Sequence, residues 1–221
     1  MKSFLWGPYA WHLIHWITLT YQPDKKESYT RLFHLLIHIL PCPICRTHYS
    51  KQLNNPTTTL TKIHDRNSAI QWGNQLHNQV NLMLGKKKTS IEQFLQQHPV
   101  FVPSKALTFL LCCLHDYVKT KNENGIKHLP NFLEQLMKVF PIPMNDFIQF
   151  NPVPKPGSDV HSLIAWYKKL FAFFRLDFQD PIFPQTHPPQ PQPQKNIESD
   201  KKNPSELWSD LDLNQLLLHA K

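Results

Sequence analysis

Glycine and cysteine are scarce in this chain, and long apolar runs are missing from it. The 221 residues include 5 glycines and 4 cysteines, which excludes collagen-like proteins and small proteins built on a disulfide framework. The longest apolar run, 109–114, is far shorter than the roughly 20 residues that a membrane-spanning helix needs. No secretory signal precedes Trp6. We therefore expect a soluble protein with no membrane span.

Proline and positive charge are abundant, and both are unevenly distributed. Of the 20 prolines, 15 lie in 99–221, so the two parts of the chain differ in kind. The net charge is +8, and residues 1–98 alone carry +7. Such a surface suits the phosphates of nucleic acid or of a cofactor, or is simply a solvated face. Because there is no arginine-rich patch and no basic strand with interleaved aromatic residues, we do not expect nucleic acid as a partner.

Helical periodicity dominates the first part of the chain. The spacing of apolar residues predicts four helices over 8–22, 25–39, 43–54 and 65–84, and a short fifth helix over 90–97. Ser90 and Gln93 have the spacing of a capping box, and Gly85 is typical of a helix stop. No segment alternates as a strand would. Residues 1–98 are therefore predicted to form an all-α domain, a four-helix bundle plus a short fifth helix.

Residues 99–221 differ from the first part in composition and in the spacing of their predicted helices. Helices are predicted over 104–121, 129–139 and 158–175, with a proline-rich connector over 141–156. We expect a second helical domain of unknown role over 99–180; the alternative is an extension that packs on the first part. Residues 181–204, rich in Pro and Gln, are predicted to be a disordered linker. Residues 205–221 are predicted to form a short acidic amphipathic helix, either a docking peptide or a frayed tail.

The sharpest local motif is a C-x-x-C between two helices. Pro41 ends one predicted helix and Pro43 begins the next, which places Cys42 at the N-cap and Cys45 one turn further on. Two intervening residues allow the sulfurs to bond, and a helix N-terminus favours a thiolate. The motif continues to His48 as C-x-x-C-x-x-H, so a zinc-stabilised helical adaptor is an alternative to redox chemistry. Buried inert thiols are a third interpretation.

A second group of residues combines aromatic rings with hydrogen-bonding side chains at helical spacing. Its members are Trp11 and His15 in the first helix, and His77, Asn78 and Asn81 in the fourth. Polar side chains turned toward an apolar bundle cost about 1–3 kcal/mol each if they lack partners. A planar ligand rich in hydrogen-bonding groups would supply those partners. Lys86, just past the fourth helix, could then reach a pyrophosphate.

Three motifs occur in a fixed order over residues 6–94. They read Trp6-Gly7-Pro8-x-x-Trp11-x-x-x-His15, then Pro41-Cys42-x-x-Cys45-x-x-His48-Tyr49, then Trp72-x4-His77-Asn78-x-Val80-Asn81-x-x-Leu84-Gly85-Lys86. Taken together, this set resembles the Erv/ALR family of FAD-linked sulfhydryl oxidases. The resemblance implies a small helical bundle that holds FAD at its mouth. It also implies a redox-active disulfide against the isoalloxazine ring of the flavin.

Residue roles follow from the same resemblance, position by position. Cys45 would be the sulfur next to the flavin, and Cys42 the interchange sulfur that faces the substrate. The residues implied to contact FAD are Gly7, Trp11, His15, Cys45, His77, Asn78, Asn81 and Lys86, and no metal is implied. Among them, Trp11 with His15, and His77 with Asn81, would serve the adenine side.

The resemblance also implies an activity and partners. It implies a thiol:oxygen oxidoreductase that forms disulfides in a dithiol protein, such as a thioredoxin-like or viral thiol carrier, and reduces O2 to H2O2. A homodimer formed through the bundle is implied as well. Cys112 and Cys113 are adjacent and match neither the structural nor the shuttle disulfides of the family, so we expect buried packing thiols. The lean pattern is most like the members from large DNA viruses, for which host cytoplasm and virion are the expected locations.

Overall fold

α-Helices are the main secondary structure of this chain in the residues that the structure describes. The computed structural model describes residues 1–97, 100–120 and 123–178, and these contain nine α-helices, two short 3-10 helices and no strand. The predicted all-α class is confirmed. Within the same ranges, no helix has both the length and the apolarity that crossing a membrane requires. The linker and the acidic helix predicted over 181–204 and 205–221 lie outside the described residues.

The five helices predicted for the first part are all present. They are α1 (Ser3–Leu19), α2 (Lys26–Ile39), α3 (Pro43–Leu53), α4 (Arg66–Met83) and α5 (Ile91–Gln96). The predicted start of this helix at residue 8 is too late, because Pro8 lies inside α1 rather than at its beginning. Proline has no N–H group, so Pro8 deprives only the Phe4 carbonyl of its intrahelical donor. That loss is tolerated near a helix N-terminus.

Side-chain caps explain where α4 and α5 begin. The Ser90 side chain accepts a hydrogen bond from the Gln93 N–H at 3.2 Å, and Gln93 Oε1 accepts one from the Ser90 N–H at 3.0 Å. This is the capping box predicted from the sequence. At the start of α4, Asp65 Oδ1 accepts a 2.7 Å hydrogen bond from the Ser68 N–H. Both helices therefore begin where a side chain satisfies an otherwise unpaired backbone donor.

A glycine ends α4, as predicted. Gly85 has a φ of 68°, in the left-handed region that costs residues with a Cβ atom about 1 kcal/mol or more. The Gly85 N–H donates to the Leu82 carbonyl at 3.1 Å, and the Lys86 N–H donates to the Asn81 carbonyl at 2.8 Å. These two bonds form a Schellman motif. The turn fixes the point at which the basic segment 86–88 leaves the helix.

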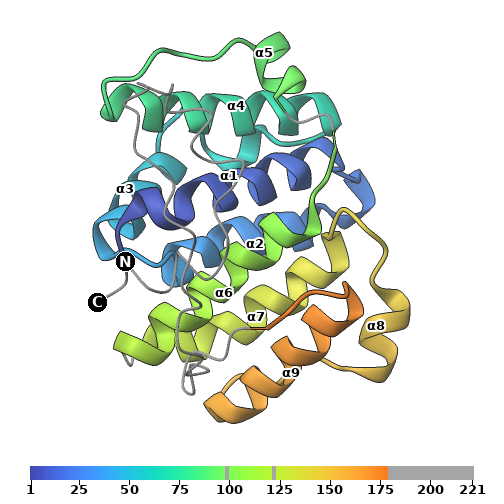
Figure 1. The fold of residues 1–221 in the computed structure, drawn as a ribbon. Helices are drawn as coiled ribbons and strands as arrows, with labels where there is room; N and C mark the ends of the chain where they lie inside the picture. Colours follow the sequence, from blue (N-terminus) through green and yellow to red (C-terminus); the bar gives the residue numbers. More distant parts are fainter. Residues whose placement is uncertain (98–99, 121–122, 179–221) are drawn as a thin grey trace, which may run out of the picture.

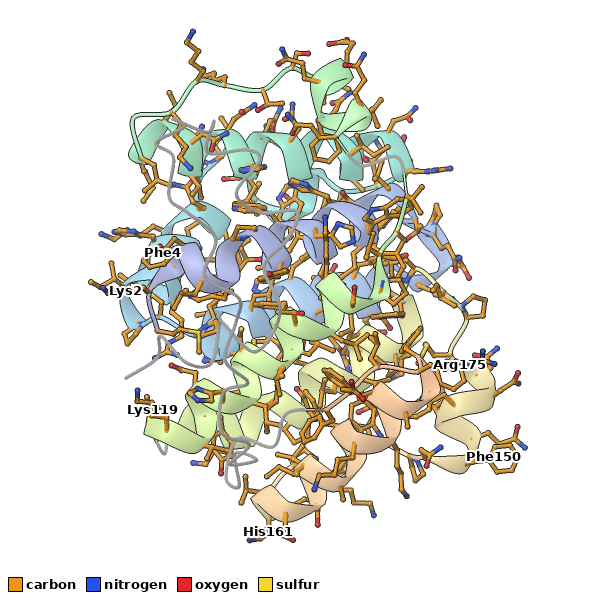
Figure 2. The ribbon with its side chains drawn as sticks, in the orientation of Figure 1. Lys2, Phe4, Lys119, Phe150, His161 and Arg175 are labelled. Carbon is orange, nitrogen blue, oxygen red and sulfur yellow. A yellow bond between two sulfur atoms is a disulfide. The ribbon has the colours of Figure 1, made fainter. Side chains whose placement is uncertain are left out.

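Helices α1 and α2 lie at the centre of the molecule (Figure 1). On one side, α4 packs on α1 and α3 packs on α2; on the other, α6 (Pro103–Thr120) packs along α1 and α7 (Glu123–Val139) along α2. Two further helices, α8 (Asn145–Phe150) and α9 (Val160–Phe173), lie at the end away from α4 and α5, where Phe150 and His161 are labelled in Figure 2. Helix α8 was missed, because prolines on both sides made its segment resemble a connector.

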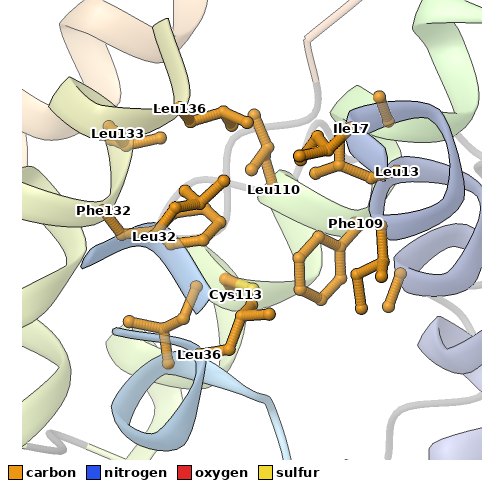
Figure 3. Packing of buried hydrophobic residues seen from close by; sticks show 14 of the residues in the cluster. Leu13, Ile17, Leu32, Leu36, Phe109, Leu110, Cys113, Phe132, Leu133 and Leu136 are labelled. Atoms are coloured by element: carbon orange, nitrogen blue, oxygen red, sulfur yellow. The ribbon is translucent and has the colours of Figure 1, made fainter. Parts of the chain in front are cut away.

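Buried apolar side chains from both parts of the chain form one continuous cluster (Figure 3). It joins Leu13 and Ile17 of α1 and Leu32 and Leu36 of α2 to Phe109, Leu110 and Cys113 of α6 and Phe132, Leu133 and Leu136 of α7. The second part thus packs on the first through α6 and α7, and the division of the chain into two domains stays a prediction. Independent folding of 1–98 and 99–180 stays a prediction.

The segment between α5 and α6 is also fixed to α1. The Val102 N–H donates to His12 Nε2 at 3.1 Å. The Phe101 ring stacks on His12, with 5.6 Å between centroids and 11° between planes, and meets Trp16 edge-on at 5.7 Å. Because His12 is only 6% exposed, this contact holds the second part of the chain at a defined position on α1.

Candidate active site

Cys42 and Cys45 form a disulfide at the N-terminus of α3. Their Cα atoms are 5.2 Å apart. Cys42 is the N-cap and Pro43 the first helical residue, as predicted from the sequence. Both cysteines are half-buried, whereas Ile44 between them is 68% exposed. A substrate thiolate can therefore approach this disulfide from solvent.

The backbone at the N-terminus of α3 stabilises negative charge on the Cys42 sulfur. The Cys45 N–H donates a hydrogen bond to Cys42 Sγ at 3.2 Å. The N-terminus of a helix also carries a partial positive charge. Once the disulfide is reduced, both features stabilise a thiolate on Cys42 and make it a better leaving group in thiol exchange.

His48 does not complete a metal site with the two cysteines. Its side chain is exposed on α3, and the two sulfurs are bonded to each other. Across the part of the chain that the structure describes, no three His, Cys, Asp or Glu side chains are close enough together to hold a metal ion. The zinc-adaptor alternative thus has no assembled ligand set among those residues.

The aromatic and imidazole residues predicted on two helices do come together. Trp11 of α1 stacks on His77 of α4, with 4.2 Å between ring centroids and 13° between planes. His77 Nδ1 lies 3.2 Å from His15 Nε2. Two ring nitrogens at this distance share a hydrogen bond only if one carries a proton and the other does not. The cluster of Trp11, His15 and His77 therefore offers a flat aromatic surface beside polar ring atoms.

Helix α5 closes this cluster from one side. Phe94 packs its ring edge-on against His15, with centroids 4.5 Å apart and an interplanar angle of 64°. Each of the two residues is only 1% exposed. Phe94 was not singled out from the sequence, although it is the one aromatic residue of the short helix α5, whose other apolar residues are Ile91 and Leu95. A single aromatic residue in so short a helix was the available signal.

Three amide side chains of α4 differ in their burial and in their hydrogen-bond partners. Asn81 is 8% exposed and Asn74 7% exposed. The amide of Asn78 pairs with the backbone of Thr89, donating to its carbonyl at 2.9 Å and accepting from its N–H at 2.8 Å, and also donates to Asn74 Oδ1 at 3.3 Å. Asn78 therefore holds the segment that follows Gly85 against α4. A cofactor contact for Asn78 stays a prediction, and Asn74, one turn earlier on the same face, was missed.

A glycine that was not singled out from the sequence brings α4 close to α1. A Cβ atom at Gly73 would lie 3.0 Å from Thr18 Oγ1 and 3.2 Å from Thr18 Cγ2. Thr18 is fully buried and donates to the His15 carbonyl at 2.7 Å. His77 is one turn along α4 from Gly73. The close approach at Gly73 thus allows the His15–His77 contact.

Gly7 presents the opposite case. It lies within α1, where glycine costs about 0.5–1 kcal/mol relative to alanine. Yet a Cβ atom at this position would meet no other atom within 4 Å. Packing among the described residues therefore does not require a glycine here. The position is half-buried and has open space beside it within that part of the chain.

Cys112 and Cys113 are buried on α6 and are not bonded to each other. Burial, with a smaller contribution from Asp116, raises the pKa of Cys112 to about 12. Burial also raises the pKa of Cys113 well above its usual value. Cys113 lies among apolar side chains of α2 and α7 (Figure 3). The expectation of buried packing thiols is confirmed.

The fold and the site define a helical thiol-redox protein, and two comparisons place it further. The model of the Erv1/Alr family matches residues 8–99. A probable FAD-linked sulfhydryl oxidase of Acanthamoeba polyphaga mimivirus is 31% identical to this chain over 101 residues, which make up 43% of this chain and 70% of the viral protein. No solved structure matches. The chain belongs to the Erv1/Alr family, as its motifs indicated.

Proposed function

We propose that this chain is an FAD-dependent sulfhydryl oxidase that forms disulfides in dithiol proteins, with O2 as electron acceptor and H2O2 as product. One observation carries the proposal. A half-buried disulfide at a helix N-terminus, Cys42–Cys45, occurs in the same bundle as the stacked cluster of Trp11, His15 and His77. The family match and the printed function of the mimivirus relative support it.

The residues present fit FAD. We propose that it is held by Gly7, Trp11, His15, Cys45, His77, Asn78, Asn81 and Lys86. A ring cluster suits flat aromatic groups, imidazole and amide groups suit their polar edges, and the exposed Lys86 suits a phosphate. The open space at Gly7 is the independent observation, because no atom of the described residues lies within 4 Å of the place where its Cβ atom would be.

The chain's own part in the reaction is thiol–disulfide exchange. A substrate thiolate attacks Cys42 Sγ, a bond forms between these sulfurs, and Cys45 leaves as a thiolate. The second substrate thiolate then attacks the bound substrate sulfur, and Cys42 leaves as a thiolate. The substrate has lost two electrons and gained a disulfide, and the Cys42–Cys45 pair has gained those two electrons. The Cys45 N–H, 3.2 Å from Cys42 Sγ, stabilises the second leaving group.

Reoxidation of the pair belongs to the cofactor. When bound, FAD supplies the two-electron oxidation of the dithiol and the transfer of those electrons to O2. We propose that Cys45 is the sulfur nearest the flavin. The test is the visible spectrum of the purified full-length chain, together with O2 uptake in dithiothreitol. We expect a yellow protein that consumes O2; a folded, colourless protein that loses helicity with a chelator would instead support the zinc-adaptor alternative.

The partners follow from the same proposal. The substrate is a dithiol protein, of which a thioredoxin-like or viral thiol carrier is the proposed example, and for a viral chain the proposed locations are host cytoplasm and virion. The homodimer implied by the family is also part of the proposal, and light scattering tests it. Because α6 and α7 of the same chain cover α1 and α2, two chains would have to associate through other surfaces.

A further inference from the structure

The turn that carries Cys42 is closed by a side chain from the redox motif itself. The Leu40 carbonyl accepts two hydrogen bonds, one from the Cys42 N–H at 2.7 Å and one from Arg46 Nη1 at 2.8 Å. The Arg46 N–H in turn donates to the Cys42 carbonyl at 3.0 Å. Arg46 therefore fixes the turn at Cys42 in two ways. Its backbone N–H binds the Cys42 carbonyl, and its guanidinium group binds the Leu40 carbonyl to which the Cys42 N–H also donates.

The guanidinium group of Arg46 faces a carboxylate from the second part of the chain. Asp116 Oδ2, on α6, lies 3.8 Å from Arg46 Nη1, and the Asp116 side chain is only 7% exposed. The α-amino group of Met1 also lies close to this carboxylate, 3.5 Å from Asp116 Oδ1. A carboxylate this deeply buried is expensive unless cations compensate it. Asp116 and Arg46 thus hold each other in place.

The positive charge of Arg46 also affects the pKa of two neighbouring groups, His38 and Cys113. The pKa of His38 is lowered by burial first, then by His128, then by Arg46. The pKa of Cys113 is raised mainly by burial, whereas Arg46 acts on it in the opposite direction. The guanidinium group lies where α2, α3 and α6 meet, because it contacts the Leu40 carbonyl after α2 and Asp116 on α6. Its charge acts on groups of α2 and α6.

We infer that Asp116 is a positioning residue for the Cys42–Cys45 disulfide, acting through Arg46. The inference rests on the proposed function and assigns a role to residues 100–178. Asp116 orients Arg46 toward the Leu40 carbonyl, and its negative charge offsets part of the positive charge beside the redox motif. Positive charge near a thiolate stabilises the reduced form of a cysteine pair. Asp116 thereby keeps the disulfide less oxidising than Arg46 alone would make it.

The test uses the full chain and the equilibrium constant of the Cys42–Cys45 pair with glutathione, read by alkylation of free thiols and mass. Asp116→Asn is expected to shift this constant three- to tenfold toward the dithiol, because Arg46 loses its compensating charge. Arg46→Met is expected to shift it three- to tenfold toward the disulfide. A tenfold shift in this two-electron couple is about 30 mV. Loosening of the structure alone gives no reason for opposite signs.

Two comparisons keep the test decisive. Glu134→Gln removes a carboxylate from an exposed ion pair on the same half of the chain, with Lys138 at 2.8 Å, and is expected to stay within about 1.5-fold of the parent. Asp116→Glu keeps the charge and is expected to restore the constant to within twofold. If Asp116→Asn does not fold, a comparison of Arg46→Lys with Arg46→Met takes its place. Only Arg46→Lys, which keeps the positive charge, should then stay near the equilibrium constant of the parent.

Shifts of the same sign in Asp116→Asn and Arg46→Met, or an Asp116→Asn value equal to that of Glu134→Gln, would overturn the inference. The readout needs neither bound flavin nor turnover. A colourless chain that still shows opposite shifts would remove the oxidase proposal and keep the role of Asp116. A yellow, active chain without those shifts would keep the oxidase proposal and remove the role of Asp116.

Discussion

His15 and His77 place their ring nitrogens 3.2 Å apart although 62 positions separate them in the chain. The contact joins α1 to α4 at the level of Trp11, and both helices carry residues proposed to bind FAD. It is helped by the close approach at Gly73, where a Cβ atom would lie only 3.0 Å from Thr18 Oγ1. The proposed cofactor site is thus built by the packing of two helices rather than by either one.

Replacing His77 by phenylalanine separates the stacking of this cluster from its hydrogen bond. His77→Phe keeps an aromatic ring against Trp11 but removes the nitrogen that meets His15. We expect FAD affinity to fall about 5- to 30-fold, as for the loss of about 1–2 kcal/mol of hydrogen bonding. The measurement is the dissociation constant for FAD by fluorescence titration, with helicity checked by circular dichroism. Unchanged affinity would show that the His15–His77 contact does not serve the cofactor.

Gly7 and Gly73 form a matched pair for a second prediction. The Cβ atom of Gly7→Ala meets no atom of the described residues within 4 Å, so we expect about 0.5–1 kcal/mol of added stability from helix propensity together with weaker FAD binding. Gly73→Ala meets Thr18 at 3.0 Å, so we expect a loss of about 1–2 kcal/mol from overpacking. Urea unfolding without FAD measures both effects. Thr18→Ala should rescue Gly73→Ala, and a Gly7→Ala chain that binds FAD as tightly as the parent would contradict the role of Gly7.

Local signals in the sequence were sufficient for the helices and for the redox motif. The capping box of Ser90 and Gln93, the stop at Gly85 and the N-cap at Cys42 depend on neighbouring residues, and all three are confirmed. The roles of Gly73 and Asp116 depend on which helices meet. Spacing within one helix carries no information about a partner helix, so neither residue was identified. For the same reason, the packing of α6 and α7 on α1 and α2 was left open.

The two redox cysteines are expected to fail in different ways when replaced. Cys45→Ser leaves Cys42 with no partner to form a disulfide, so its thiolate should attack a probe thioredoxin whose one active-site cysteine is held as a mixed disulfide with thionitrobenzoate. A Cys42–thioredoxin disulfide forms, thionitrobenzoate leaves as a thiolate, and the covalent adduct should accumulate because no neighbouring thiol resolves it. Cys42→Ser should form little adduct, and its remaining thiolate beside FAD should add a long-wavelength absorbance band. Non-reducing gels and visible spectra read the two outcomes. The reverse pattern would exchange the roles of Cys42 and Cys45.

Acid is expected to destabilise the contact between α2 and α7. His38 and His128 stack with 3.9 Å between ring centroids. Burial lowers the pKa of each below the usual 6.5. His128 and then Arg46 lower the pKa of His38 further, and Lys127 lowers the pKa of His128 further. The unfolded chain therefore binds more protons than the folded chain as the pH falls through 6.5. The stability from these neutral rings is complete above that pH and is lost toward the lower, folded-state pKa.

Urea midpoints at pH 7.5 and pH 5.5 measure this effect. We expect a lower midpoint at pH 5.5 in the parent and a smaller drop in His128→Gln, which removes one of the two stacked imidazoles. His48→Gln replaces an exposed imidazole on α3 and serves as the control. Its urea midpoint is expected to fall by as much as that of the parent. Equal drops in all three chains would rule out the stacked pair as the source of the acid sensitivity.

The last prediction concerns the boundary at residue 98. Every motif shared with the family lies before it, so a chain ending at residue 98 is expected to keep FAD. It should also oxidise dithiothreitol within about tenfold of the full chain, or about 1.4 kcal/mol of barrier.

The same cut uncovers apolar side chains of α1 and α2, among them Leu13, Ile17, Leu32 and Leu36, which pack against α6 and α7 in the full chain. Uncovered apolar faces of this kind associate in water, so light scattering should find dimers or larger species of the short chain. A separately produced 99–180 chain should reverse that association by covering the same faces. Loss of flavin from a short chain that stays helical would mean that residues 99–180 complete the cofactor site, and the proposed boundary would then be wrong.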